Sequence, residues 1–225
     1  MNTIKLLIDP QNVCLDIKQN PRWIQAFILI SVLGILSGAL TLPFSMQLAA
    51  AKMGVIPAGQ MERVKDMSQM FGYVGLVFVP IALLIKWAVM GFFLYLLGIL
   101  FRSEMKFKSL FSLLAHANII LIVSSLVNIL ILFIKGPESI QHPLDLNVIG
   151  LHILFDFESM NHSLYYFFSL INVFEIWYLV VLFMGLELIF DLDRAKSAAI
   201  IGVYWLISIS AMTGFASFSE KFQQF

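Results

Sequence analysis

The sequence predicts an all-α fold, an integral membrane bundle of five transmembrane helices with short interfacial helices. Of its 225 residues, 60% are apolar and 12% are charged, against about 45–50% and about 25% in soluble domains. Its mean hydropathy is +0.91. Five apolar runs each reach the roughly 20 residues that cross about 30 Å of hydrocarbon. This composition argues against a water-soluble enzyme and a disordered chain, and the zero net charge argues against a nucleic-acid binder.

The first span is expected at about residues 24–44, where no charge interrupts the apolar run. Arg22 and Trp23 precede it as a basic and aromatic anchor pair suited to the headgroup zone. The mixed segment before Pro21 is interpreted either as a short interfacial segment on the bilayer surface or as a plain cytoplasmic tail.

The second span is expected at about residues 76–100, with a kink at Pro80. Apolar residues recur at helical spacing over residues 61–71, with charged residues between them. This pattern predicts an amphipathic helix that lies on the membrane and leads into the second span.

The remaining spans are expected at about residues 109–134, 165–190 and 198–218, so that residues 1–225 form one transmembrane domain. Between the third and fourth spans, Val148–Phe155 is apolar but too short to cross a bilayer. We expect this stretch to dip into the interface or to cover the bundle. A crossing there would make six spans.

Basic residues in short loops predict the orientation of the chain. Eight of the 14 lie on the N-terminal side of the expected spans, namely Lys5, Lys18, Arg22, Arg102, Lys106, Lys108, Arg194 and Lys196. Five lie on the other side, and Lys86 lies within the membrane. We therefore expect a multi-pass protein with a cytoplasmic N-terminus and a C-terminus outside.

Three stretches carry a resemblance to a known family. They are Asp9-Pro10 with Pro21-Arg22-Trp23, the run Lys106–His116, and Phe174–Leu186 followed by Ala195-Lys196. Together with five spans, they resemble the Yip1-domain family of polytopic membrane proteins in its compact, prokaryotic-type form. The resemblance implies an inner (plasma) membrane address. The third span departs from many members, because His116-Ala117-Asn118-Ile119-Ile120 lacks the proline found there.

Lys86 and Glu175 are opposite charges predicted to lie near mid-depth on separate spans, within about 6 Å of the same level. Each charge costs about 2.5–3.5 kcal/mol at the bilayer centre. We expect the two side chains to face one another or to share a polar cavity. Three interpretations stay open at this point: a structural ion pair, a transport or binding site, and no contact.

Three further polar residues complete this intramembrane polar site as a hypothesis. Asn172 lies three residues before Glu175 and so on the same helix face, while His116 and Asn118 lie nearer the inner surface. His116 titrates near neutrality when unperturbed and would then relay protons, whereas burial favours its neutral form. For the two asparagines we favour hydrogen bonds that join helices.

Two weaker patterns remain. Gly34 and Gly38 form a Gly-x-x-x-Gly pair that permits close helix approach, within the bundle or in a dimer. His152 and Asp156 are four residues apart, as a metal site on a helix requires, but such residues in a wet loop are usually solvated. Further His, Asp and Glu residues of this connector are His142, Asp145, Glu158 and His162. We predict no metal and no cofactor.

No nucleophile motif or phosphate-binding glycine loop stands out. We therefore expect no enzyme, but a membrane-organising or partner-binding protein. Its expected partners are the lipid bilayer and another membrane protein or a second copy of the chain. The alternative is a small transporter or channel for ions, protons or lipids that uses Lys86 and Glu175.

Overall fold

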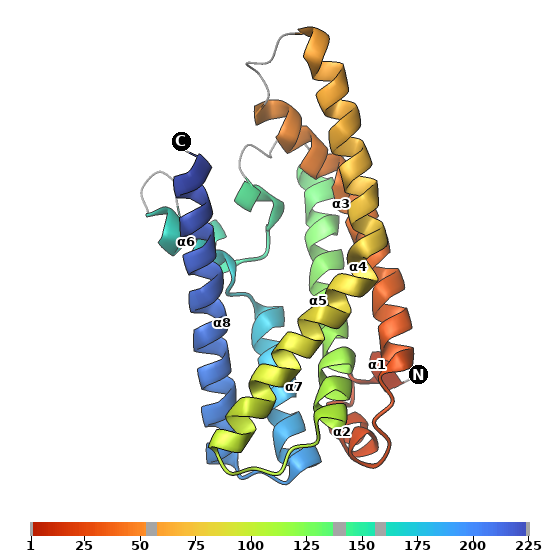
Figure 1. Cartoon of the computed structure of the whole chain (residues 1–225), viewed down its shortest axis with the longest axis vertical. Helices are drawn as coiled ribbons and strands as arrows, with labels where there is room; N and C mark the ends of the chain where they lie inside the picture. Colours follow the sequence, from red (N-terminus) through yellow and green to blue (C-terminus); the bar gives the residue numbers. More distant parts are fainter. Residues whose placement is uncertain (1, 53–57, 137–142, 156–160, 224–225) are drawn as a thin grey trace.

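The computed structural model describes residues 2–52, 58–136, 143–155 and 161–223. Its elements are α1 (Asn2–Lys5), α2 (Pro10–Gln19), α3 (Ile24–Lys52), α4 (Ala58–Leu100), α5 (Phe107–Lys135), the 3-10 helices η2 (Pro143–Leu146) and η3 (Leu151–Leu154), α6 (His162–Ser169), α7 (Val173–Phe190) and α8 (Arg194–Gln223). Five stretches of the described residues are long and apolar enough to cross a membrane, as predicted: Ile24–Leu48, Gln69–Leu100, Phe107–Lys135, Val173–Phe190 and Arg194–Gly214. They form an elongated bundle with the two chain termini toward opposite ends (Figure 1).

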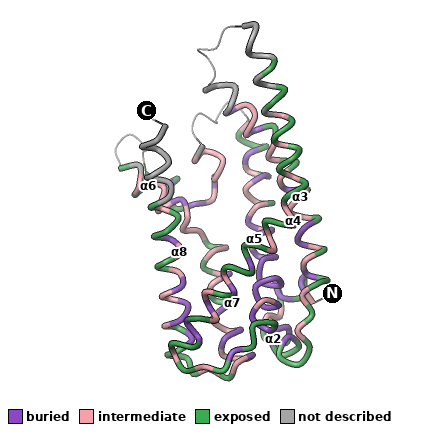
Figure 2. The backbone as a smooth tube through the Cα atoms, viewed as in Figure 1, coloured by how far each residue is buried: buried purple, intermediate pink, exposed green. Residues whose placement is uncertain are grey.

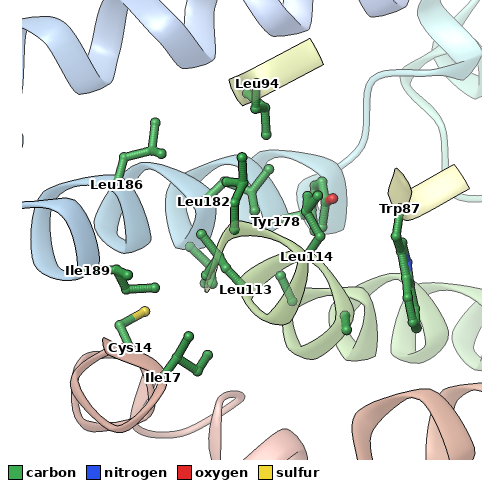
Figure 3. Close-up of a cluster of buried hydrophobic side chains, with 14 of the residues drawn as sticks. Cys14, Ile17, Trp87, Leu94, Leu113, Leu114, Tyr178, Leu182, Leu186 and Ile189 are labelled. Carbon is green, nitrogen blue, oxygen red and sulfur yellow. The ribbon is translucent and has the colours of Figure 1, made fainter. Parts of the chain in front are cut away.

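Helix α5 forms the centre of the bundle and packs against α3, α4 and α7. Leu113 and Leu114 of α5 meet Leu182 of α7 in a cluster of fully buried side chains (Figure 3). Gly185 of α7 permits this approach, because a Cβ there would lie 2.4 Å from Leu113 Cδ2. Close packing of this kind holds helices together in lipid, where burying apolar surface offers no gain between helices.

One end of the bundle holds α2, residues 101–106 and residues 191–193, and is called the basic end here. Buried residues are concentrated in this half of the molecule, whereas α3 and α4 project beyond the other helices at the opposite end (Figure 2). The tightest core therefore lies toward the basic end.

The N-terminal segment packs against protein, which corrects its interpretation as a plain cytoplasmic tail. Val13, Cys14 and Ile17 of α2 are buried in the main apolar core, and α2 packs on α7. Lys18 Nζ lies 2.6 Å from both carboxylate oxygens of Asp191 and ties α2 to the end of α7. The buried face of α2 thus packs on the transmembrane helices.

Helix α4 runs without interruption from Ala58 to Leu100, so the predicted separate amphipathic helix on the membrane is wrong. The amphipathic stretch continues the second span instead. Pro80 lies inside α4, and α4 bends along its length (Figure 1). A proline inside a helix removes one backbone hydrogen bond, which is a usual cause of such bends.

Gly34 and Gly38 of α3 both face α4. A Cβ at Gly38 would lie 2.6 Å from Leu76 Cδ2, and one at Gly34 would lie 3.2 Å from Val79 Cγ1. The Gly-x-x-x-Gly pair therefore brings two helices of the same bundle together.

Candidate functional site

The fourth span is broken, which corrects the continuous helix expected over residues 165–190. Helix α6 ends at Ser169 and α7 begins at Val173. Asn172 is the N-cap of α7, since its Oδ1 accepts hydrogen bonds from the backbone N–H of Phe174 (3.0 Å) and of Glu175 (2.9 Å). Asparagine is a favoured cap because its side chain satisfies backbone donors that a helix start leaves unpaired. Asn172 therefore shares no helix face with Glu175, and its hydrogen bonds to the described residues cap α7 instead of joining two helices.

The connector before α6 supplies hydrogen bonds to this break. Asn147 Nδ2 donates to the carbonyl of Ser169 at 2.7 Å, and the N–H of Leu151 donates to the carbonyl of Ile171 at 2.8 Å. Gly150 permits the approach, because a Cβ there would lie 2.5 Å from Ser169 O. Backbone outside a helix is tolerated at membrane depth only where protein or trapped water satisfies it.

Asn128 of α5 holds the other side of the connector. Its Nδ2 donates to the carbonyl of Leu146 at 2.6 Å, and its Oδ1 accepts from the N–H of Val148 at 2.8 Å. Val148 is itself buried against Phe44, Leu48 and Leu132. Residues 143–155 thus cover and brace the bundle without a sixth crossing.

Sequence reasoning did not assign these roles to Asn128, Asn147 and Gly150. Their partners lie about 20 residues away along the chain, so no local pattern marks the contacts. Two local features could have pointed to these roles. Asn128 is a polar residue inside an apolar run, and Gly150 lies in a connector that prolines interrupt.

Lys86 and Glu175 do not form a direct ion pair, for no N–O contact within 4 Å joins them among the salt bridges of the described residues. Lys86 is exposed on the surface of α4, whereas Glu175 is half-buried in the first turn of α7. Their charges still act on each other. The start of α7 also favours a carboxylate, because the N-terminus of a helix carries a partial positive charge. The direct ion pair expected as one interpretation is therefore not formed.

His116 and Asn118 lie in two different surroundings. Asn118 Oδ1 accepts a hydrogen bond from Trp87 Nε1 at 3.4 Å, which joins α5 to α4. His116 is only 4% exposed, and its Nδ1 lies 2.8 Å from the carbonyl oxygen of Ser112. It lines a polar cavity at the basic end. The five residues of the predicted polar site are thus distributed over the helix break, the surface of α4, the contact between α4 and α5, and the basic end.

The connector offers little to a metal. His152 is buried with its ring 5.0 Å from that of Tyr165, and burial lowers the pKa of His152 because desolvation disfavours the imidazolium. Its predicted partner Asp156 lies outside the described residues, as do His142 and Glu158. Within the described ranges, no group of three His, Cys, Asp or Glu side chains is placed to hold an ion.

The comparisons with known proteins agree with the architecture. The family model described as the Yip1 domain matches residues 4–216, which is nearly the whole chain. No curated protein and no solved structure matches it. A multi-pass helical bundle whose sequence fits this model from α1 to α8 is a member of the Yip1-domain family.

Proposed function

We propose that the protein works without chemical turnover, as a membrane-organising protein that binds another membrane protein through the outward face of α4. The observation that carries this proposal is the position of Lys86, a cation exposed within a membrane span. It has no hydrogen bond or salt bridge to the described residues.

The outward face of α4 is apolar and largely uncovered. Only 11% of the residues in the most apolar stretch of α4 are buried, against 39% in α5. Its exposed large side chains are Phe71, Val74, Phe78, Ile81, Ile85, Val89, Phe92, Leu96 and Ile99. Gly75 and Ala82 are also exposed on this helix, and small residues let a second helix approach closely.

Lys86 lies about 21 Å along the helix from Leu100 and about 25 Å from Gln69, at 1.5 Å per residue. A lysine side chain of roughly 6 Å does not span that distance to the interface. Left facing lipid, the ammonium would cost about 2.5–3.5 kcal/mol. An acidic or amide side chain on a neighbouring transmembrane helix would offset this cost and select the partner.

Site-specific photo-crosslinking in native membranes tests the proposal. A photoreactive residue at Phe78 is expected to give a discrete crosslinked protein, and Lys86→Met is expected to reduce that product severalfold. The same probe at Ile207, exposed on α8, is the matched control and is expected to give none. A product of twice the chain mass would identify a second copy as the partner. Identical products at Phe78 and Ile207, or products insensitive to Lys86→Met, would refute the proposal.

The positive-inside rule supports an orientation in which the basic end faces the cytoplasm of a bacterial-type inner membrane. The N-terminus is then cytoplasmic and the C-terminus outside. In a Cys14→Ser background, an impermeant thiol reagent applied to whole cells should label Lys135→Cys and spare Glu104→Cys. The reverse pattern would invert the assignment.

A second function is favoured by the broken fourth span. Discontinuous helices are common at the binding sites of transporters, where helix starts and unwound backbone face the substrate or the coupling ion. Glu175 in the first turn of α7, coupled electrostatically to Lys86, fits a small transporter or channel for ions, protons or lipids. Liposomes tested for proton and cation flux distinguish the two functions. Flux that Glu175→Gln abolishes in a folded protein favours transport, and equal flux from both proteins removes this role.

A further inference from the structure

A polar cavity of about 250 Å³ lies at the basic end, between the N-terminal segment and the first turns of α3 and the lower part of α5. It is lined by Asn2, Asp16, Ile17, Asn20, Arg22, Gln25 and His116. Arg22 and Gln25 lie at the start of the first span, so the cavity opens close to the membrane–water boundary. The cavity therefore lies at the depth at which lipid headgroups are found.

Two opposite charges lie in this cavity without neutralising each other. Neither Asp16 nor Arg22 takes part in a salt bridge among the described residues, and both are exposed at the cavity. The carboxylate of Asp16 accepts a hydrogen bond from Asn2 Nδ2, a neutral donor that leaves its charge uncompensated. A ligand that carries one negative and one positive group would compensate both charges at once.

His116 provides a buried polar group in the same cavity. Only 4% of His116 is exposed, and its Nδ1 lies within hydrogen-bond distance of the Ser112 carbonyl oxygen. Among the described residues, no hydrogen bond is found for Nε2, the other ring nitrogen. An imidazole whose second nitrogen is open to a cavity can bond a phosphate oxygen or a headgroup ammonium, according to its protonation.

We propose that this cavity binds a phosphoethanolamine group, a phosphodiester next to a primary ammonium. Arg22 binds the phosphate as a charge-assisted donor, and Asp16 accepts from the ammonium. The group has about eight non-hydrogen atoms, and a cavity of about 250 Å³ has room for it. The carboxylate disfavours a purely anionic headgroup. The lining holds no aromatic cage of the kind that binds quaternary ammonium groups, so choline fits less well.

The adjoining surface favours a lipid as the source of this group. Ile24, Ile28, Val32 and Leu36 form an exposed row at intervals of four residues along α3, and the row begins one residue before Gln25, which lines the cavity. Residues four apart lie on one helix face, so this row gives an acyl chain an apolar track. A free phosphoethanolamine compound would use the cavity alone.

Native mass spectrometry of the delipidated full-length protein tests the inference. Phosphatidylethanolamine, phosphatidylglycerol and phosphatidylcholine with the same acyl chains are added separately at equal concentration. The phosphatidylethanolamine adduct is expected to exceed the other two severalfold. Arg22→Gln is expected to lower it about tenfold, as the loss of a charge-assisted hydrogen bond does. Asp16→Asn is expected to abolish the preference over phosphatidylglycerol.

Lys108→Gln and Glu104→Gln are the matched controls, because they remove exposed charges at the basic end outside the cavity. Both should bind like the wild-type protein. Soluble glycerophosphoethanolamine distinguishes the sources: displacement of the lipid at similar concentration identifies the free compound as a ligand, and failure to displace it identifies the lipid. Equal adducts of the three lipids, or equal losses in control and cavity variants, would overturn the inference. Arg22→Gln and Asp16→Asn both change exposed residues, so if one variant misfolds, the other still tests the inference.

Discussion

Replacing Asn128 with alanine should loosen the connector that covers the break in the fourth span. The substitution removes both hydrogen bonds to the connector, the 2.6 Å bond to Leu146 O and the 2.8 Å bond from Val148 N–H. Each is worth about 1 kcal/mol net, and hydrogen bonds between membrane helices average about 0.6 kcal/mol with a maximum of about 1.7. We therefore expect a loss of about 2 kcal/mol in the free energy of unfolding.

The measurement is reversible unfolding in bicelles, combined with hydrogen exchange of the amides in residues 143–155. Exchange in this segment should accelerate in Asn128→Ala, whereas amides of α2, at the far end of the bundle, should stay at their wild-type rates. Ser125→Ala is the matched control. Ser125 is a half-buried polar residue one turn earlier on α5, and no hydrogen bond ties it to the described part of the connector.

Two results together would refute this reasoning. One is an unfolding free energy of Asn128→Ala within about 0.5 kcal/mol of the wild type, the level of ordinary surface substitutions. The other is unchanged exchange over residues 143–155. The connector would then be held by its apolar contacts alone.

Two further predictions concern the core of the basic end. Gly185→Ala should lower the free energy of unfolding by about 1–3 kcal/mol, because the added Cβ would overlap Leu113. Gly202→Ala is the control, since open space surrounds Gly202, and it should be near neutral in the same unfolding assay. Equal effects would contradict the packing of α5 on α7. Burial raises the pKa of the Cys14 thiol from 9.0 to about 12. Maleimide labelling of Cys14 at pH 8 should therefore be slow until α2 separates from the bundle. Rapid labelling of the folded protein would show that α2 is not docked. Because the pKa of Cys14 is higher in the folded than in the unfolded protein, the stability that its neutral thiol contributes is complete below pH 9. This contribution is lost as the pH rises toward 12.

The sequence was sufficient to predict that five helices cross the membrane. Run length and apolar composition are local properties, and a bilayer accepts only segments that satisfy their own backbone. The same reasoning located Lys86 and Glu175 within spans. It did not predict that Trp23 packs edge-on against Phe111, with ring centroids 5.3 Å apart, because this contact joins segments far apart in the sequence.

The polar site could not be predicted as a unit, because its parts depend on contacts between distant segments. Asn172 was assigned to a helix face by its spacing from Glu175, but a side chain that can cap a helix competes with continuing it. The connector stabilises the interrupted form, because Asn147 and Leu151 donate hydrogen bonds to the carbonyls of Ser169 and Ile171. In a continuous helix these carbonyls would bond to the helix's own backbone.

Local chemistry thus accounts for how many helices cross the membrane and how apolar each of them is, since hydropathy acts residue by residue. The docking of α2 on α7, the interrupted fourth span and the cavity around His116 arose from packing and hydrogen bonds across the bundle. Such long-range partners carry no periodic signature, because their free energy exists only once the helices are assembled.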